Sequence, residues 1–403
     1  MFVVRDMLLG MGTVAFDLKD RVQALLPSML EMRRDFHRHP ELAFQERRTS
    51  AKLADHLEKI GLEVTRNIAE TGLMARLKGG KPGKTVMVRA DIDALPITET
   101  TGAAYASVAP GVMHACGHDG HATIAAHVAT LFSQMRDQIA GEVRFVFQPA
   151  EEIVQGAKPM VEAGVLEGVD RVVGLHLFNQ LPVGTVGVRP GPSMAAADAF
   201  TLTLHGKGGH AASPHLAVDT VVIASHIIVA LQTLVSRETD PVGTSVVTIA
   251  TVTAGDGAHN IIPEVAELKG TLRTFDPTLR EHLMRRIYNL ASGIAAAMGA
   301  SAEISWRPGS PAVVNDAPLT ERFRGIAREL VGDKLIETPP VMGGDDMAEF
   351  LNRVPGVYFW VGSADASTGR DKPHHHPGFD FDDERTLPLA TELLARTALD
   401  FLK

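Results

Sequence analysis

Apolar positions between Asp17 and Ile60 recur at helical spacing, which predicts a mostly helical stretch. The run HRHPELAFQE contains Pro40 and predicts a break between two helices. Beyond it, short apolar runs typical of strands alternate with a helical run. The predicted strands are TVMVRADID, EVRFVFQ and RVVGLHL, and the predicted helix is HATIAAHVATLFSQMRDQ. This alternation indicates an α/β domain with a mostly parallel sheet and helices on both faces.

The pattern changes after the Pro/Gly-rich run VRPGPSM. The next elements follow the order β-α-β-β-α-β of a ferredoxin-like α+β domain: FTLTLHG, AVDTVVIASHIIVALQTLVS, TSVVTIATVT, EVAELKGTLRTF, a helix opened by Asp276-Pro277, and AEISWRP. Beyond RPGSPAVVND the α/β pattern resumes with helix ERFRGIARELVG, strand GVYFWVG and a closing helix from Pro388 to Leu402. We therefore expect one α/β domain formed by residues 1–192 and 312–403, interrupted by an insert at 193–311.

Size and composition fit two folded domains. The chain has 403 residues, of which 45% are hydrophobic, enough for two packed cores. The formal net charge of -9 gives no electrostatic reason to bind nucleic acid or an anionic membrane surface, so we expect small-molecule partners. The apolar run from Leu216 to Val235 includes Asp219, His226 and Gln232, which favours a buried or amphipathic helix over a membrane span.

The single cysteine, Cys116, excludes an intrachain disulfide. This favours a reducing compartment, and we expect the cytoplasm, although a disulfide-free periplasmic protein would have the same composition. The first residues, MFVVRDMLLGMGTVAF, are interrupted by Arg5 and Asp6 and precede no A-x-A cleavage site. We therefore expect an irregular start and no export.

Ionisable side chains gather near the predicted ends of strands in the α/β domain. Asp91 and Asp93 belong to RADIDALP, Glu151 and Glu152 to QPAEE, and His176 to GLHL. Because ligands bind beyond the carboxyl ends of parallel strands, segments far apart in the sequence can converge there. Two further clusters, HACGHDGH and KPHHHPGFDF, add a thiol and several imidazoles.

Taken singly, each of these groups could have a purely structural role. A lone cysteine is usually a small buried apolar residue, and a strand-end aspartate often caps a turn or helix. Adjacent carboxylates such as Glu151 and Glu152 are costly after an apolar strand unless a cation or a proton offsets them. One thiolate with several imidazoles and carboxylates suits Zn, Mn, Co or Ni. Jointly, the residues indicate a site for divalent metal ions.

The motifs together resemble the hippurate hydrolase and auxin-conjugate hydrolase branch of the aminoacylase and carboxypeptidase-type di-metal peptidases. They follow the family's order and spacing over nearly the whole chain: HRHPELAFQE, RADIDALPI, MHACGHDGH, QPAEE, GLHL, GKGGHAASPH, NIIPEVAELKGTLRTF and HHPGFDFDD. The resemblance implies that the insert is a lid and dimerisation domain. One departure is MGGDDM, where the family usually has Gly-Ser-Glu-Asp-Phe.

This resemblance implies two divalent metal ions, with Cys116 as the bridge between them. The implied ligands are Cys116, His118, Glu152, His176 and His375. His375 is chosen because the family's last ligand stands two residues before the Pro of the H-x-P-x-F-D-F run. Asp91 stands where carboxypeptidase relatives have a histidine and is not carried over as a ligand, whereas Asp93 is expected to orient one.

The implied reaction is hydrolysis of the amide bond of an N-acyl amino acid, such as a hippurate-like, N-acetyl or indole-acetyl conjugate. A hydroxide held between the two ions attacks the amide carbon, and Glu151 acts as general base and then as general acid. In the insert, the resemblance assigns His210 of the dimer partner to the oxyanion. It assigns Asn260 and Arg273 to the carboxylate of the substrate.

Two features of the insert bear on assembly. Glycines 206, 208 and 209 suggest either a tight turn that presents His210 or an ordinary hairpin turn with an exposed histidine. The residues alone favour the ordinary hairpin, and the resemblance favours the presented His210. The strand TSVVTIATVT carries apolar groups on both faces and is a candidate for continuing a sheet across two subunits. We expect a homodimer or a higher homo-oligomer.

Other functions remain open from the residues. Within hydrolases, the alternatives are a dipeptidase or carboxypeptidase and an N-acetyl-diaminopimelate deacetylase. A small-solute binding protein would also have two domains, but it would not need a carboxylate beside a metal ligand. A non-haem iron redox enzyme typically needs two His and one carboxylate with open positions, a smaller ligand set than the one implied.

Overall fold

The computed structural model describes residues 2–403, with side chains described from residue 18 onward. The chain divides into two compact units. Unit 1 comprises Met1–Gly191, Val314–Pro339 and Asp346–Lys403, and unit 2 comprises Pro192–Val313 and Pro340–Asp345. The insert predicted from the sequence, 193–311, does not include Pro340–Asp345. That short segment joins unit 2 because Val341 pairs with Met194 and accepts a hydrogen bond from Ala195 N–H.

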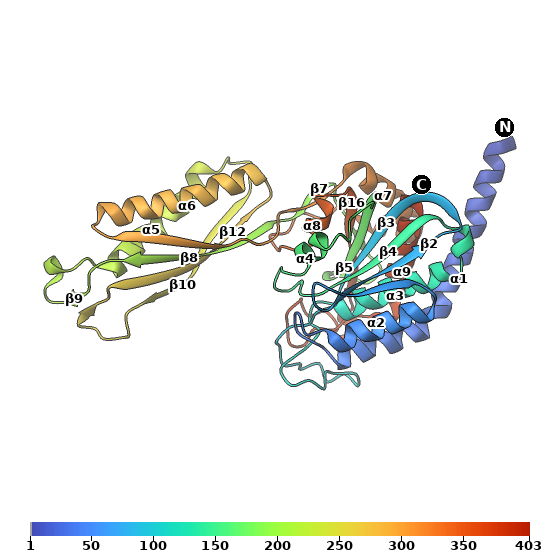
Figure 1. The fold of residues 1–403 in the computed structure, drawn as a ribbon, viewed down its shortest axis with the longest axis horizontal. Coiled ribbons are helices and arrows are strands. Elements are labelled where there is room, and N and C mark those ends of the chain that lie inside the picture. The colour runs from blue at the N-terminus through green and yellow to red at the C-terminus, as the bar shows by residue number, and fades with distance from the viewer. Residues whose placement is uncertain (1) are drawn as a thin grey trace. The chain divides into compact units, whose positions relative to one another are not determined.

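Unit 1 is built on an eight-stranded sheet in the order β1-β2-β4-β3-β5-β16-β6-β15. Strands β2, β4, β3, β5 and β16 of this sheet are labelled in Figure 1. The strands are β1 (Glu63–Ile68), β2 (Gly72–Lys78), β3 (Lys81–Asp91), β4 (Ala140–Gln148), β5 (Arg171–Pro182), β6 (Val186–Gly187), β15 (Leu335–Ile336) and β16 (Gly356–Ala364). The central strands β4, β3, β5 and β16 run parallel, whereas β1, β2 and β4 pair antiparallel. The sheet is therefore mixed, with the predicted parallel part at its centre.

Helices cover this sheet. They are α1 (Phe2–Arg38), α2 (Arg47–Lys59), α3 (His118–Ser133), α4 (Ala157–Glu162), α7 (Ala317–Val331), α8 (Ala348–Leu351) and α9 (Asp383–Phe401). Helices α1, α3 and α9 contact one another, and α3 and α9 also pack on β3 and β5. Their apolar faces join those of the strands in one buried core.

Three predicted boundaries in unit 1 are wrong. The backbone is helical from Phe2, so the chain start is not irregular. Helix α9 begins at Asp383 rather than Pro388, because the Asp382 side chain accepts a hydrogen bond from Arg385 N–H and caps it. Strand β5 continues to Pro182, since its pairing with β16 extends beyond the predicted end. His176 therefore lies in the middle of β5 rather than near its end.

Unit 2 has the β-α-β-β-α-β order expected from the sequence. Its strands β8 (Ala196–His205), β10 (Ser245–Ala254), β12 (Val265–Thr274) and β13 (Ser301–Arg307) form an antiparallel sheet in the order β10-β12-β8-β13. Helices α5 (Thr220–Thr233) and α6 (Pro277–Ala297) contact each other and pack on this sheet (Figure 1). Short strands β9 (Gly209–His210) and β11 (Ile261–Ile262) pair separately, and β7 (Gly191–Met194) pairs with β14 (Val313–Asn315).

One helix among the described residues is long and apolar enough to cross a membrane by length and composition. It runs from Thr220 to Glu238 and combines α5 with a π-helical extension. Ile223, Ile227 and Leu231 of this helix are buried in the core of unit 2. Its apolar character is therefore partly explained by packing, as expected for a core helix.

Candidate metal centre

A first group of predicted ligands converges in unit 1. Helix α3 begins at His118, Cys116 lies two residues before it, and β5 contributes His176. Cys116 Sγ lies 3.5 Å from His176 Nε2. One ligand atom from each of Cys116, His118 and His176 lies within 4.8 Å of the others. These three side chains form the first donor group.

A second donor group shares Cys116 with the first. It adds Glu152, from the turn after β4, and His375, from the loop before α9. His375 Nε2 lies 3.2 Å from Glu152 Oε2. His375 has a left-handed φ of 64°, uncommon for a residue other than glycine, and its N–H donates to the Ala115 carbonyl at 2.8 Å. That hydrogen bond ties the His375 loop to the segment that carries Cys116.

Both imidazoles of the first group are held through Nδ1. His118 Nδ1–H donates to the Asp93 carbonyl at 2.9 Å, and the Asp93 carboxylate lies 3.3 Å from the same nitrogen. His176 Nδ1–H donates to the Leu177 carbonyl at 2.6 Å. Partners of this kind fix the tautomer and orientation of metal-binding histidines. With Nδ1 engaged in this way, the Nε2 atom of each neutral ring is left for a metal ion.

The donor atoms fit a cation. In the described part of the chain, His118 Nε2 and Glu152 Oε1 are buried and have no hydrogen-bond partner. Buried polar atoms are nearly always paired, so two such atoms 3.9 Å apart require an explanation. Glu151 Oε2 lies 3.8 Å from the same His118 nitrogen. A divalent ion would pair with these atoms, and a set of thiol, imidazole and carboxylate donors suits Zn, Mn, Co or Ni.

The charges around the centre also favour a cation. Burial acts to lower the pKa of His118, but the charges of Asp91 and Asp93 outweigh it and raise this pKa to about 10. Burial, together with the charges of Glu152 and Glu151, raises the pKa of the Cys116 thiol well above its ordinary value. The carboxylates around His118 and Cys116 therefore favour positive charge, and a bound cation would favour the thiolate.

His121 belongs to the centre but was not predicted. Its Nδ1–H donates to Asp91 Oδ1 at 2.6 Å, and its Nε2 accepts from Leu177 N–H at 2.9 Å. Both ring nitrogens are thus engaged, so His121 supports the site rather than offering a ligand atom. Asp91 also accepts from Arg89 at 2.7 Å. The available sequence signal was the spacing of three between His118 and His121, which places both on one helix face.

The three consecutive histidines near the chain end have different surroundings. His374 Nε2–H donates at 2.9 Å to the Leu177 carbonyl, the same carbonyl that holds His176. His375 reaches Glu152, and exposed His376 accepts from Gly378 N–H at 2.9 Å. His375 and His376 are both exposed, but only the predicted His375 lies against a carboxylate of the donor cluster.

Three predicted site residues lie in unit 2. His210 on β9 is exposed and pairs in register with Ile261, and the Asn260 carbonyl accepts from Ala211 N–H at 3.0 Å. His210 and Asn260 are therefore neighbours. Arg273 on β12 is half-buried, and its guanidinium donates to the carbonyls of Asp198 and Leu272 at 3.3 and 3.2 Å.

The glycines before His210 lie in a paired, extended segment rather than in the predicted tight turn, because Lys207 pairs with Val218 and Gly209 with Ile262. None of glycines 206, 208 and 209 is among the described residues with a left-handed φ. At Gly206 a Cβ atom would lie 2.4 Å from the Val218 carbonyl oxygen. Close approach of two backbones therefore explains this glycine better than turn conformation does.

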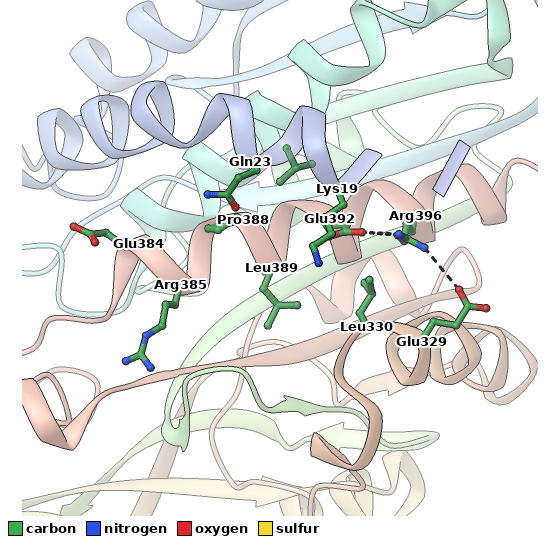
Figure 2. Close-up of a pocket in the computed structure, with 11 residues that line it drawn as sticks. Lys19, Gln23, Glu329, Leu330, Glu384, Arg385, Pro388, Leu389, Glu392 and Arg396 are labelled. Carbon is green, nitrogen blue, oxygen red and sulfur yellow. Dashed lines mark hydrogen bonds and ion pairs between the residues drawn. The ribbon is translucent and has the colours of Figure 1, made fainter. Parts of the chain in front are cut away.

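A surface groove of about 690 Å³ lies elsewhere in unit 1, between α1, α7 and α9 (Figure 2). Leu330 and Leu389 line it, and Arg396 at its edge pairs with Glu392 at 2.6 Å and Glu329 at 3.7 Å. None of the residues that line this groove belongs to the donor cluster. The described residues that line the groove bring together no group of imidazole, thiol and carboxylate side chains, so it offers no comparable chemistry.

Comparisons with known proteins agree with the geometry. N-acetylcysteine deacetylase of Bacillus subtilis (strain 168) is 41% identical over 377 residues, which cover 93% of this chain and 97% of the relative. Thermostable carboxypeptidase 2 of Saccharolobus solfataricus is 38% identical over 371 residues, covering 91% and 94%. The solved structure of the YXEP protein of Bacillus subtilis, described as a dinuclear metal binding peptidase from the M20 family, has a TM-score of 0.82 and 38% identity, covering 94% and 99%.

The fold and the donor cluster, together with these relatives, define a metal-dependent hydrolase of the amidohydrolase and peptidase class. The model of peptidase family M20/M25/M40 matches residues 87–400. The chain belongs to this family.

Proposed function

We propose that this protein hydrolyses the amide bond of N-acyl amino acids at a two-ion centre in unit 1. The observation that carries the proposal is the pair Glu151 and Glu152 beside a cysteine and three histidines, with two ligand atoms buried and unpaired among the described residues. A relative named N-acetylcysteine deacetylase supports an N-acyl amino acid as substrate.

The donor groups support a division of ligands between two ions. One group holds Cys116, His118 and His176, the other holds Cys116, Glu152 and His375, and the two groups share only Cys116. A thiolate common to both groups is suited to bridge two ions. We therefore assign one ion to each group and Cys116 to both.

We assign Glu151 to proton transfer. When bound, the ions would polarise the amide carbonyl and lower the pKa of a water molecule toward about 7. Glu151 would take the proton from the attacking water and return it to the departing amine nitrogen. Its carboxylate is largely buried and lies 3.8 Å from His118 Nε2, so it is within the centre without belonging to either ligand group that we assign.

A hydrolysis screen tests the substrate class. Metal-supplemented protein would be incubated with hippurate, N-acetyl amino acids, indole-acetyl conjugates and dipeptides, and the released amine would be quantified. We expect N-acyl amino acids to be cleaved faster than dipeptides. Preference for dipeptides would instead support the carboxypeptidase alternative, which the relative named thermostable carboxypeptidase 2 favours. Metal binding without any turnover would indicate a solute-binding protein.

In unit 2 we assign His210 to the oxyanion of the reaction. Its Nδ1 accepts from Ala212 N–H at 3.0 Å, so in the neutral ring the proton is on Nε2. An exposed N–H donor is what an oxyanion requires. The neighbouring Asn260, with Arg273, would bind the substrate carboxylate, for which a guanidinium is well suited.

We further propose a homodimer formed through unit 2. Strand β10 is at the edge of its sheet, and Val252 on it is 50% exposed. On α5, Val221, Val222 and Val229 are also exposed. Unpaired strand edges and exposed apolar side chains are features of association surfaces. The small-molecule substrate and a cytoplasmic location are predictions that accompany this assignment.

Subunit mixing tests whether His210 acts on the partner's centre. His210→Ala and Glu151→Gln proteins should each be inactive, and a mixture that exchanges subunits should recover about a quarter of wild-type activity. After random exchange of equal amounts, half of the dimers contain one subunit of each variant. Each of these heterodimers has one intact centre out of two. Demonstrated exchange without recovered activity would show that His210 does not act across the dimer.

A further inference from the structure

The turn that carries Glu151 and Glu152 has a constrained backbone. Ala150 and Val154, on either side of the two glutamates, have left-handed φ values of 54° and 56°. Such conformations are costly in residues other than glycine and persist only where the surroundings enforce them. At Gly156 a Cβ atom would lie 1.6 Å from the Pro149 carbonyl oxygen, so the turn also closes tightly on itself.

Three buried carboxylates from distant segments bind the backbone of this turn. Glu46 Oε1 accepts from Ala150 N–H at 2.9 Å. Asp93 Oδ2 accepts from Glu152 N–H at 3.0 Å. Asp346 Oδ2 accepts from the N–H groups of Gly156 and Ala157 at 3.2 and 2.9 Å. We call Glu46, Asp93 and Asp346 the carboxylate clamp.

Glu46 is the member of the carboxylate clamp that binds a residue with a left-handed φ, Ala150. It precedes α2, is fully buried, and belongs to the HRHPELAFQE motif, which has no part in the proposed chemistry. Its second oxygen accepts from Thr71 Oγ1 at 2.5 Å. One carboxylate oxygen therefore fixes Ala150, immediately before Glu151, while the other is anchored in the core of unit 1.

We propose that Glu46 is a positioning residue that acts through Ala150 to place Glu151 and Glu152 in the metal centre. This inference rests on the proposed function, in which Glu151 transfers protons and Glu152 binds an ion. Without the hydrogen bond from Ala150 N–H, the turn would lose the side-chain contact to its first left-handed residue and keep only the bond from Gln155 N–H to the Ala150 carbonyl. Both glutamates would then be less well placed.

Two substitutions of Glu46 distinguish a positioning role from a need for its negative charge. A glutamine at position 46 keeps the length of the side chain, so its carbonyl oxygen can still accept from Ala150 N–H. Its amide group can donate to Thr71 Oγ1, because a hydroxyl also accepts hydrogen bonds. An aspartate keeps the charge but is one methylene shorter and does not span both partners. Positioning therefore predicts that Glu46→Gln is milder than Glu46→Asp.

The experiment measures Mn²⁺ binding by titration calorimetry on the full-length protein after removal of metal, together with kcat and KM on hippurate. For Glu46→Asp we expect one of the two ions to bind about 10–100-fold more weakly, as is typical when a group that supports a ligand is changed. We expect kcat to fall by a similar factor while KM changes less. For Glu46→Gln we expect the ion affinity and kcat to stay within about threefold of wild type.

Thr71→Val is the matched control, because it removes the other hydrogen bond of Glu46 and leaves the Ala150 contact. We expect ion binding within about threefold of wild type for this variant as well. Equal damage in Glu46→Gln and Glu46→Asp would overturn the proposal, as would wild-type binding and turnover in Glu46→Asp. Ion binding is measured without substrate, so failure of hippurate as a substrate would count against the proposed function and leave the test of Glu46 intact.

Discussion

Glu151→Gln is expected to retain both metal ions and to lose about 10²–10⁴-fold in kcat, the usual contribution of general acid-base catalysis. The amide of glutamine occupies nearly the same volume but cannot carry a proton between the attacking water and the amine nitrogen. Glu151 belongs to neither of the two ligand groups that share Cys116, so the assigned ligands stay complete. Metal content per subunit and kcat on hippurate are the two measurements.

A matched control for this substitution lies on the strand that precedes the turn. Glu142 is near the start of β4, where it pairs with Arg76 at 2.9 Å and Arg144 at 2.7 Å. Glu142→Gln should leave kcat close to wild type. It removes the same kind of charge, but from a carboxylate on β4 that lies away from the donor cluster. Wild-type turnover by Glu151→Gln would exclude Glu151 as the base, and loss of an ion would make it a ligand.

Cys116→Ala is expected to weaken the binding of both ions by more than about 100-fold, because the side chain belongs to both donor groups. Metal content after dialysis measures the effect. Cys116→Ser keeps a small polar donor and should lose less. Loss of only one ion in Cys116→Ala would contradict the bridging role and assign the thiolate to a single ion.

The order of elements could be predicted because hydrophobic periodicity is local. The β-α-β-β-α-β order of unit 2 and the central strands of unit 1 follow from such patterns. Strands β1 and β2 were not predicted. β1 is exposed along most of its length, with the burial of Ile68 an exception, and so lacks the alternation that marks a half-buried strand. Antiparallel pairing of β2 with β4 is a long-range feature that no local pattern encodes.

The metal centre could be predicted only in part, because some of its contacts join residues that are far apart in the sequence. Cys116, His118 and Glu152 stand in short motifs with recognisable spacing. By contrast, Glu46 binds Ala150 across 104 positions, and Asp346 binds Ala157 across 189. Single buried carboxylates of this kind have no local signature, because their role is defined by a backbone N–H that tertiary folding brings to them.

The central claim is that two ions in unit 1 are required for amide hydrolysis. Its most direct measurement is the release of glycine from hippurate by metal-free protein titrated with Mn²⁺, with bound ions counted at each step. We predict no hydrolysis without metal and full activity only as the second ion binds. The account would be contradicted if the metal-free protein were as active as the metal-loaded protein. It would also be contradicted if two ions bound to each subunit and neither hippurate nor any other N-acyl amino acid were cleaved.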